Sequence, residues 1–356
     1  MRYIPASCLR EGQMLATDLV MDRRRVILRR GVPLSRSIIN RIIKLGFQGV
    51  YIDDDLSKDL IVANIISDEL KDKAKHEVKT LFAAAQKKSD RTVIQMDSIR
   101  DVVANIVDEI LYNRNVIVNI VDLRTFDDYT FSHCINVALL STVVGMAMGM
   151  MRDDLNELAM GALIHDIGKV FIDKDLINKA EVLTPEEYDE LRRHSQYGYD
   201  YIASNHNIPD AAKEVVLTHH EKYDGSGYPL KQKGDEISLF SRIVCVADIY
   251  DALTSDRPYR NAMLPSDVME YMMSGYNTMF DPAVVDAFTR RVAAYPIGTL
   301  ITLSTGQSAI VVENFEDAGS RPKVRLIENG ESTDKFIDLA HDADALNITI
   351  SGIELM

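Results

Sequence analysis

Histidines and aspartates occur in the middle of the sequence at positions whose neighbours are apolar. His165 and Asp166 are adjacent in ALIHDIGKV, and His219 and His220 open the stretch HHEKYDGSGYP. A buried imidazole or carboxylate without a partner is costly, so each of these side chains needs one. For any one of them, a hydrogen-bonded place in the core is a sufficient account. Metal ions would satisfy all of them together.

Seven side chains on five expected helices form the candidate ligand set. They are His133, His165, Asp166, His194, His219, His220 and Asp248. Imidazole and carboxylate donors without a thiolate suit iron, manganese, zinc, cobalt or nickel. One ion takes about four to six ligands, so seven protein ligands predict two divalent ions that share a carboxylate. Asp166, which has two oxygens beside a ligand histidine, is the expected bridge.

A pair of metal ions indicates hydrolysis of a phosphoester. A water held between two ions about 3.5–4 Å apart loses its proton near neutral pH and attacks as hydroxide. Asp166, as the expected bridge between the two ions, is therefore a predicted catalytic residue. Lys169, one helical turn beyond His165, is expected to place a cation over the phosphate. Arg257 and Arg260 in SDRPYRNAM are expected to contact a phosphate or stack on a base. Standing alone, these three cations would be ordinary surface charges.

The elements that must position these groups are predicted to be helices. Residues 91–295 follow a helical apolar pattern almost throughout. In LTPEEYDELRRH, Thr184 is the expected N-cap, Pro185 the first helical residue and Glu187 the partner in a capping box. Residues 296–356 change to alternating apolar and polar residues between Gly and Asp turns. That pattern predicts a small β-sheet or barrel.

The first ninety residues divide into two parts. VMDRRRVILRRG indicates two short strands, SRSIINRIIKLGF a helix capped by Ser35 or Ser37, and GVYID a third strand. Residues 56–90 predict a connecting helix whose apolar stripe packs either within its own chain or against a second copy in a homodimer. The predicted domains are an α+β domain at 1–55, a helical connector at 56–95, a catalytic domain at 96–295 and a β-rich domain at 296–356.

Composition limits the partners and the compartment. The net charge of −14 argues against a partner that is a nucleic-acid polymer or an anionic membrane. Three widely spaced cysteines form no disulfide framework, and no signal-peptide pattern opens the chain, so we expect a cytoplasmic protein. The apolar stretch 134–151 is about long enough to span a membrane. Its small and hydroxyl residues and the adjacent histidine favour a core helix instead of a membrane span.

HDIGK, HHEKYDGSGYP and ADIYDALTSDRPYR, with His133 upstream and His194 between them, resemble the HD-GYP family over about residues 110–290. This branch of the HD-domain phosphohydrolases hydrolyses the bacterial second messenger cyclic di-GMP to pGpG, GMP or both. The resemblance implies a mainly α fold, an all-helical HD-domain bundle, here with a small α+β domain before it and a small β domain after it. It also implies a buried site of two ions, usually iron or manganese, held by the seven candidate ligands, with Lys169 and the two arginines on phosphate.

The GSGYP turn borders the substrate pocket in that family. Gly225 and Gly227 would take positive φ angles and let the backbone approach a planar ligand, and Tyr228 would offer a ring and a hydroxyl. Glu221 would act structurally or orient a ligand histidine. A plain surface turn is the alternative for this loop.

One position departs from the family pattern. Some members have a glutamate one helical turn before the first histidine, where it helps to hold a third metal. Here that position is Tyr129, whose phenol is a poor ligand at neutral pH, and Asp128 is out of helical phase. We therefore expect two metals.

Two other functions stay open at this stage. The substrate could be cyclic GMP-AMP or a linear nucleotide, because base selection depends on pocket shape and a few hydrogen bonds. The chain could also be a catalytically weak module that binds cyclic di-GMP and signals through partners such as GGDEF-type proteins.

Overall fold

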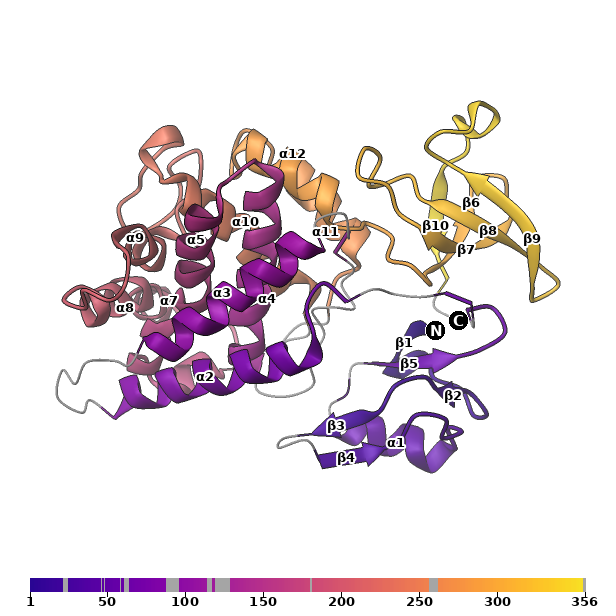
Figure 1. The fold of residues 1–356 in the computed structure, drawn as a ribbon, viewed down its shortest axis with the longest axis horizontal. Helices are drawn as coiled ribbons and strands as arrows, with labels where there is room; N and C mark the ends of the chain where they lie inside the picture. Colours follow the sequence, from indigo (N-terminus) through magenta and orange to yellow (C-terminus); the bar gives the residue numbers. More distant parts are fainter. Residues whose placement is uncertain are drawn as a thin grey trace. The chain divides into compact units, whose positions relative to one another are not determined.

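The computed structural model describes residues 1–21, 25–45, 47, 49–57, 59–60, 64–87, 96–113, 117–118, 129–179, 181–255 and 262–354. The chain forms two compact units: unit 1 comprises residues 1–63, 117–128 and 292–356, and unit 2 comprises residues 64–116 and 129–291. The predicted fold class is confirmed, since a helical bundle is accompanied by small β-containing parts at both ends of the chain (Figure 1).

In its described residues, the N-terminal part of unit 1 contains five strands, one short 3-10 helix and one α-helix. A three-stranded sheet has the order β1-β5-β2, and β3 pairs with β4. The predicted cap is confirmed, because the Ser35 hydroxyl accepts a hydrogen bond from the Ile38 amide at 3.3 Å. The elements are β1 (Arg2–Pro5), η1 (Ala6–Cys8), β2 (Met14–Leu15), β3 (Leu19–Met21), β4 (Arg25–Leu28), α1 (Arg36–Lys44) and β5 (Gly49–Asp53).

The C-terminal part of unit 1 is a five-stranded antiparallel sheet with the order β10-β6-β7-β8-β9. Its alternating apolar residues, such as Ile301, Val311 and Val324, are buried in one core, as the period of two predicts. The elements are β6 (Leu300–Leu303), β7 (Ser308–Glu313), β8 (Lys323–Glu328), β9 (Glu331–Asp338), η6 (Ala343–Ala345) and β10 (Ile350–Ile353).

Unit 2 is a bundle in which α4 contacts α2, α3, α5, α10 and α12 (Figure 1). The Thr184 hydroxyl and the Glu187 side chain form the predicted capping box at the start of α7. The elements are α2 (Asp68–Gln86), α3 (Asp97–Tyr112), α4 (Tyr129–Ala147), α5 (Arg152–Ile164), η4 (Ile167–Phe171), α6 (Lys174–Ile177), α7 (Pro185–Arg192), α8 (His194–Ile202), α9 (Asp210–Thr218), η5 (Gly234–Glu236), α10 (Leu239–Thr254), α11 (Pro265–Ser274) and α12 (Pro282–Arg291).

Helix α4 is the one described helix that is long and apolar enough to cross a membrane. Its window at 130–147 has a mean hydropathy of 1.4, and 78% of that window is buried inside the protein. Burial on all sides explains the apolar composition, because a helix that is hydrophobic all round packs in a core. This agrees with the prediction of a core helix.

Helix α2 begins at Asp68, later than the predicted start at residue 56. Ser67 stops the helix from extending further back, since its hydroxyl accepts from the Leu70 amide and donates to Glu109 of α3 at 2.9 Å. The apolar stripe is buried within unit 2, where α2 contacts α3 and α4, so the packing is within the chain's own fold. The stripe consists of Leu70, Ala74, Val78, Leu81, Phe82 and Ala85.

Candidate metal centre

Helix ends and two core helices supply the seven candidate ligands. His133 lies on α4 and Asp248 on α10. The other five lie at helix boundaries: His165 and Asp166 directly follow α5, His194 begins α8, and His219 and His220 directly follow α9. All seven candidate ligands lie in unit 2.

A close approach at Gly168 brings two of these boundaries together. A Cβ atom added at Gly168 would lie 1.8 Å from the carbonyl oxygen of His194 and 2.5 Å from the amide nitrogen of Gly198. Only glycine fits there, because real side chains do not approach a backbone so closely. The HDIGK turn therefore packs directly on the start of α8, which places Asp166 beside His194. The sequence around HDIGK alone does not reveal this role of Gly168.

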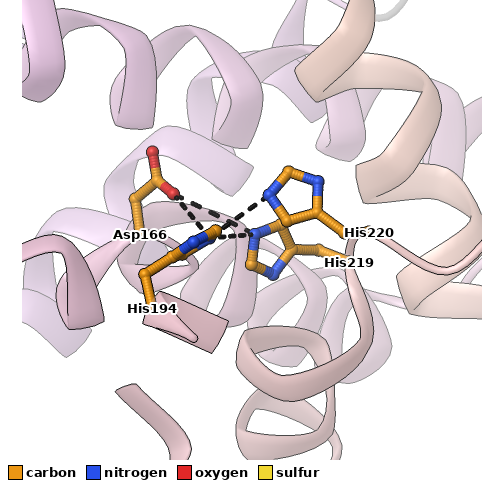
Figure 2. A group of neighbouring side chains, drawn as sticks. All are labelled: Asp166, His194, His219 and His220. Atoms are coloured by element: carbon orange, nitrogen blue, oxygen red, sulfur yellow. Dashed lines mark hydrogen bonds and ion pairs between the residues drawn. The ribbon is translucent and has the colours of Figure 1, made fainter. Parts of the chain in front are cut away.

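The seven side chains form two groups of metal-binding atoms. One group contains Asp166, His194, His219 and His220, and the other contains His133, His165 and Asp248; within each group the ligand atoms lie within 4.8 Å of one another. In the first group, Nε2 of His194 is 3.3 Å from Nε2 of His219 and 3.2 Å from Nε2 of His220 (Figure 2). Three ring nitrogens thus converge on one small region.

Asp166 lies between the two groups. Its Oδ1 is 3.5 Å from Nε2 of His194 and 4.0 Å from Nε2 of His219. Its Oδ2 is 3.3 Å from Nε2 of His165 and 3.7 Å from Nε2 of His133. Each carboxylate oxygen therefore faces a different group, which is the arrangement that a bridging carboxylate needs.

Three rings are oriented by backbone carbonyl groups. The Nδ1–H of His165 donates to Ala162 O at 2.7 Å, that of His194 to Leu191 O at 2.7 Å, and that of His219 to two carbonyl oxygens at 3.1 Å. These bonds fix the tautomer in which Nε2 carries the free lone pair and faces the cluster.

His133 is oriented by a carboxylate that the sequence analysis missed. Its Nδ1 is 2.6 Å from Oδ2 of Asp251, and Asn136 donates to Oδ1 of the same carboxylate at 2.7 Å. Its Nε2 faces Asp248 at 3.0 Å. The available signal was that Asp251 follows Asp248 by one helical turn in ADIYDAL, although on spacing alone it resembles any second acid on a helix.

Burial and charge set the protonation states of these rings. Burial lowers the pKa of His194 to about 4 and lowers the pKa values of His219 and His220 well below their usual range. Burial also opposes protonation of His133, but hydrogen bonds to Asp248 and Asp251 outweigh it and raise the pKa to about 9. Near neutral pH three rings are neutral, as metal ligands must be.

The residues present fit divalent metal ions. Among the described residues, neither Nε2 of His165 nor Oδ1 of Asp166 has a hydrogen-bond partner, although both atoms are buried. Such orphaned atoms are costly unless something binds them. The donor set of imidazole and carboxylate suits divalent transition metals, and the buried thiols of Cys134 and Cys245 belong to neither group.

Lys169 and Tyr228 lie at the edge of the cluster. The Lys169 ammonium group contacts Oδ2 of Asp166 at 2.5 Å, and the Lys169 side chain is 27% exposed. The Tyr228 ring stacks on His220 with a centroid separation of 4.7 Å and an interplanar angle of 28°. The turn thus contacts a candidate ligand directly, which a plain surface turn does not.

Two glycines and the Glu221 carboxylate shape the loop around Tyr228. Gly225 has the expected positive φ, at 85°. Gly227 does not take the expected positive φ, and glycine is needed there because an added Cβ would lie 2.4 Å from Cα of Glu221. The Glu221 carboxylate accepts hydrogen bonds from the amides of Leu230 and Lys231 at 2.7 and 3.0 Å, so its observed partners are in the loop and not a histidine.

Four residues named from the sequence fall outside this description. Arg257, Arg260 and Asp128 lie outside the described residues, as does the side chain of Tyr129. Their predicted roles stay predictions.

Comparison with known proteins agrees with this geometry. Residues 103–284 match the HD domain family. The chain is 33% identical over 232 residues to a cyclic di-GMP phosphodiesterase of Pseudomonas aeruginosa, covering 65% of this chain and 56% of that protein. It is 37% identical over 165 residues to a cyclic di-GMP phosphodiesterase of Thermotoga maritima, covering 46% and 45% of the two chains. The chain spans about half the length of these relatives.

Two further likenesses are more distant. A 3'3'-cGAMP-specific phosphodiesterase of Vibrio cholerae is 31% identical over 179 residues, covering 50% of this chain and 33% of that protein. A solved structure of an HDG"Y"P protein from Bdellovibrio bacteriovorus superimposes with a TM-score of 0.50 at 15% identity, covering 80% of this chain and 97% of that one. At that identity the structure supports the fold alone.

The fold and the cluster define an HD-domain protein with a candidate metal-binding site. The chain belongs to the HD domain family, and its motifs place it with the HD-GYP type, as the sequence resemblance predicted.

Proposed function

We propose that this protein is a metal-dependent phosphodiesterase that hydrolyses cyclic di-GMP to pGpG, GMP or both. The observation that carries the proposal is the position of Asp166, whose two oxygens face different groups of candidate ligands. A phosphodiester has two non-bridging oxygens that share one negative charge, so a site with two adjoining positive centres is suited to it. The relatives with cyclic di-GMP in their names support the choice of substrate.

The seven candidate ligands would hold two divalent ions. The imidazole-carboxylate set suits iron, manganese, zinc, nickel or cobalt, and the resemblance to the HD-GYP family makes iron or manganese the first choice. When bound, such ions supply Lewis acidity and a water of low pKa at that position. Lys169 would supply a mobile positive charge at the edge of the cluster, where it pairs with Asp166 in the structure. Buried rings and the stacked Tyr228 would exclude bulk water from the reacting phosphate.

Turnover by the purified full chain tests this proposal. The protein is loaded with Mn(II), or with Fe(II) under reducing conditions, and incubated with cyclic di-GMP, and products are separated by chromatography. Formation of pGpG or GMP that stops in a chelated control supports the proposal. Binding of cyclic di-GMP without hydrolysis would instead indicate the catalytically weak binding module.

Cyclic GMP-AMP is the second candidate substrate, because a relative from Vibrio cholerae is named for it. Parallel hydrolysis of the two cyclic dinucleotides by the same metal-loaded preparation distinguishes them. A higher kcat/KM for cyclic GMP-AMP would replace the first choice.

The domain boundaries, the further substrate contacts, the compartment and the assemblies are part of the same proposal. Residues 96–295 would be the catalytic domain, flanked by domains at 1–55 and 296–356 and by a connector at 56–95. Arg257 and Arg260 would contact the substrate, as would the loop at Gly225, Gly227 and Tyr228. The protein would act in the cytoplasm, with GGDEF-type proteins as candidate partners. A homodimer through 56–95 would have to use the outer face of α2, because its apolar stripe is buried within unit 2.

A further inference from the structure

An aromatic and cationic stack leads outward from the cluster. The Tyr228 ring stacks on His220, and the guanidinium carbon of Arg192 lies 5.2 Å from the centroid of that Tyr228 ring. The same carbon lies 4.3 Å from the ring centroid of Tyr188, whose side chain is 46% exposed. The ring separations place the Arg192 guanidinium within about 10 Å of the His220 ring, a distance that a nucleoside can bridge from a phosphate at the cluster.

Arg192 is less well paired than Lys179, which pairs with another acid of the same helix. Lys179 contacts both oxygens of Glu187 at 2.7 Å. Arg192 makes one ion pair, with Asp189 at 3.4 Å, and both side chains are largely exposed, so the pair contributes little. Among the described residues, its buried Nε has no hydrogen-bond partner. Within the described part of the chain its guanidinium is therefore held by one weak ion pair, which a ligand can replace.

The chemistry of this residue points to a base. Cation–π attraction to the two rings restrains the guanidinium group, whose N–H donors are arranged as a planar fork. An arginine edge pairs with O6 and N7 of guanine through two hydrogen bonds, whereas adenine presents a donor at the corresponding position. A lysine at the same place donates from a single nitrogen and has no planar fork that the two rings can hold, so it pairs with guanine less specifically.

We propose that Arg192 determines substrate specificity by binding a guanine base, with Tyr188 and Tyr228 holding its guanidinium in position. The proposal rests on the proposed function, because it places the scissile phosphate at the metal centre. It adds a residue on α7, outside the HDIGK and HHEKYDGSGYP motifs, that selects the base.

The kinetic test compares Arg192→Lys with Arg193→Lys in the metal-loaded full chain. Arg193 is the matched control, since it is the adjacent arginine, is 63% exposed and pairs with Glu190. Arg192→Lys should lower kcat/KM for cyclic di-GMP by about 10- to 100-fold. Its kcat/KM for the base-free diester bis(p-nitrophenyl) phosphate and its metal content should not change. Arg193→Lys should match the wild type on both substrates.

An equilibrium test does not depend on turnover. Calorimetry with GMP and AMP should show that the metal-loaded wild type prefers GMP, and that Arg192→Lys loses the preference while Arg193→Lys keeps it. An equal loss on the base-free diester, a GMP preference retained by Arg192→Lys, or no preference in the wild type would each overturn the proposal. If the wild type hydrolyses no cyclic dinucleotide, the proposed function fails, and the GMP and AMP comparison still decides the role of Arg192.

Discussion

Nδ1 of His133 lies 2.6 Å from Oδ2 of Asp251, and both side chains are buried. Asn136 holds the other carboxylate oxygen, so the ring has one orientation, with Nε2 toward Asp248 and Asp166. A carboxylate behind a ligand histidine raises the basicity of the ring and fixes its direction. Metal affinity should therefore depend on Asp251, which is not itself in either ligand group.

Asp251→Asn tests that dependence. The substitution keeps the shape of the side chain and removes its charge, so affinity for Mn(II) should fall by about 10- to 100-fold while the fold is retained. Competition with a fluorescent chelator measures the affinity, and circular dichroism checks the fold. Asp210→Asn is the control, because that carboxylate is 99% exposed and should leave the affinity unchanged. An unaltered affinity in Asp251→Asn would show that the contact orients nothing of consequence.

Asp166→Ala should abolish both metal binding and hydrolysis. The alanine removes a carboxylate whose two oxygens face different groups of candidate ligands. Metal content after dialysis is measured together with turnover of cyclic di-GMP. Normal turnover by this variant would disprove the bridging assignment.

Lys169→Ala tests whether Lys169 stabilises the transition state without contributing to metal binding. Its ammonium group touches Asp166 but belongs to neither ligand group, so the variant should retain metal. Turnover should fall by roughly 10²-fold or more, as expected when a charge that stabilises the transition state is lost. Loss of metal together with activity would contradict this division of roles.

Gly168→Ala should destabilise the metal-free protein. The new Cβ would lie 1.8 Å from the His194 carbonyl oxygen, so η4 and α8 must separate. We expect a loss of about 1–3 kcal/mol or more, seen as a lower melting temperature and weaker metal binding. Gly352→Ala is the control, since its Cβ would meet nothing within 4 Å. Equal melting temperatures for both variants would contradict the close approach.

Metal binding should release about one proton near pH 7.5. The raised pKa of His133, about 9, means that its ring is protonated in the metal-free protein and must lose that proton to become a ligand. The lowered pKa of His194 means that its ring is already neutral. Apparent affinity should therefore rise by up to about tenfold per pH unit and level off above about pH 9. Calorimetry in buffers of different ionisation enthalpy measures the release, and binding heats independent of the buffer would exclude it.

Much of the fold was predictable because local chemistry decides it. The capping box at Thr184 and the cap at Ser35 use side chains that bond the backbone within three residues. The predicted start of α2 was wrong because the cap residue Ser67 is held by Glu109, a partner far along the chain. No window of sequence around residue 67 contains that information.

The candidate ligands were predictable for a different reason, since imidazoles among apolar neighbours need partners. Asp251 was missed because its partner, His133, lies 118 residues away. Gly168 was missed because the need for glycine comes from the carbonyl oxygen of His194, which belongs to another helix. Both omissions concern residues that position ligands, and their role follows from tertiary contacts instead of side-chain type.

The most direct test of the account measures metal content and turnover on the same sample of the full chain. Elemental analysis should find two divalent transition metal ions per chain in protein that hydrolyses cyclic di-GMP, and chelation should remove metal and activity together. Undiminished hydrolysis by protein that contains no transition metal would contradict the account.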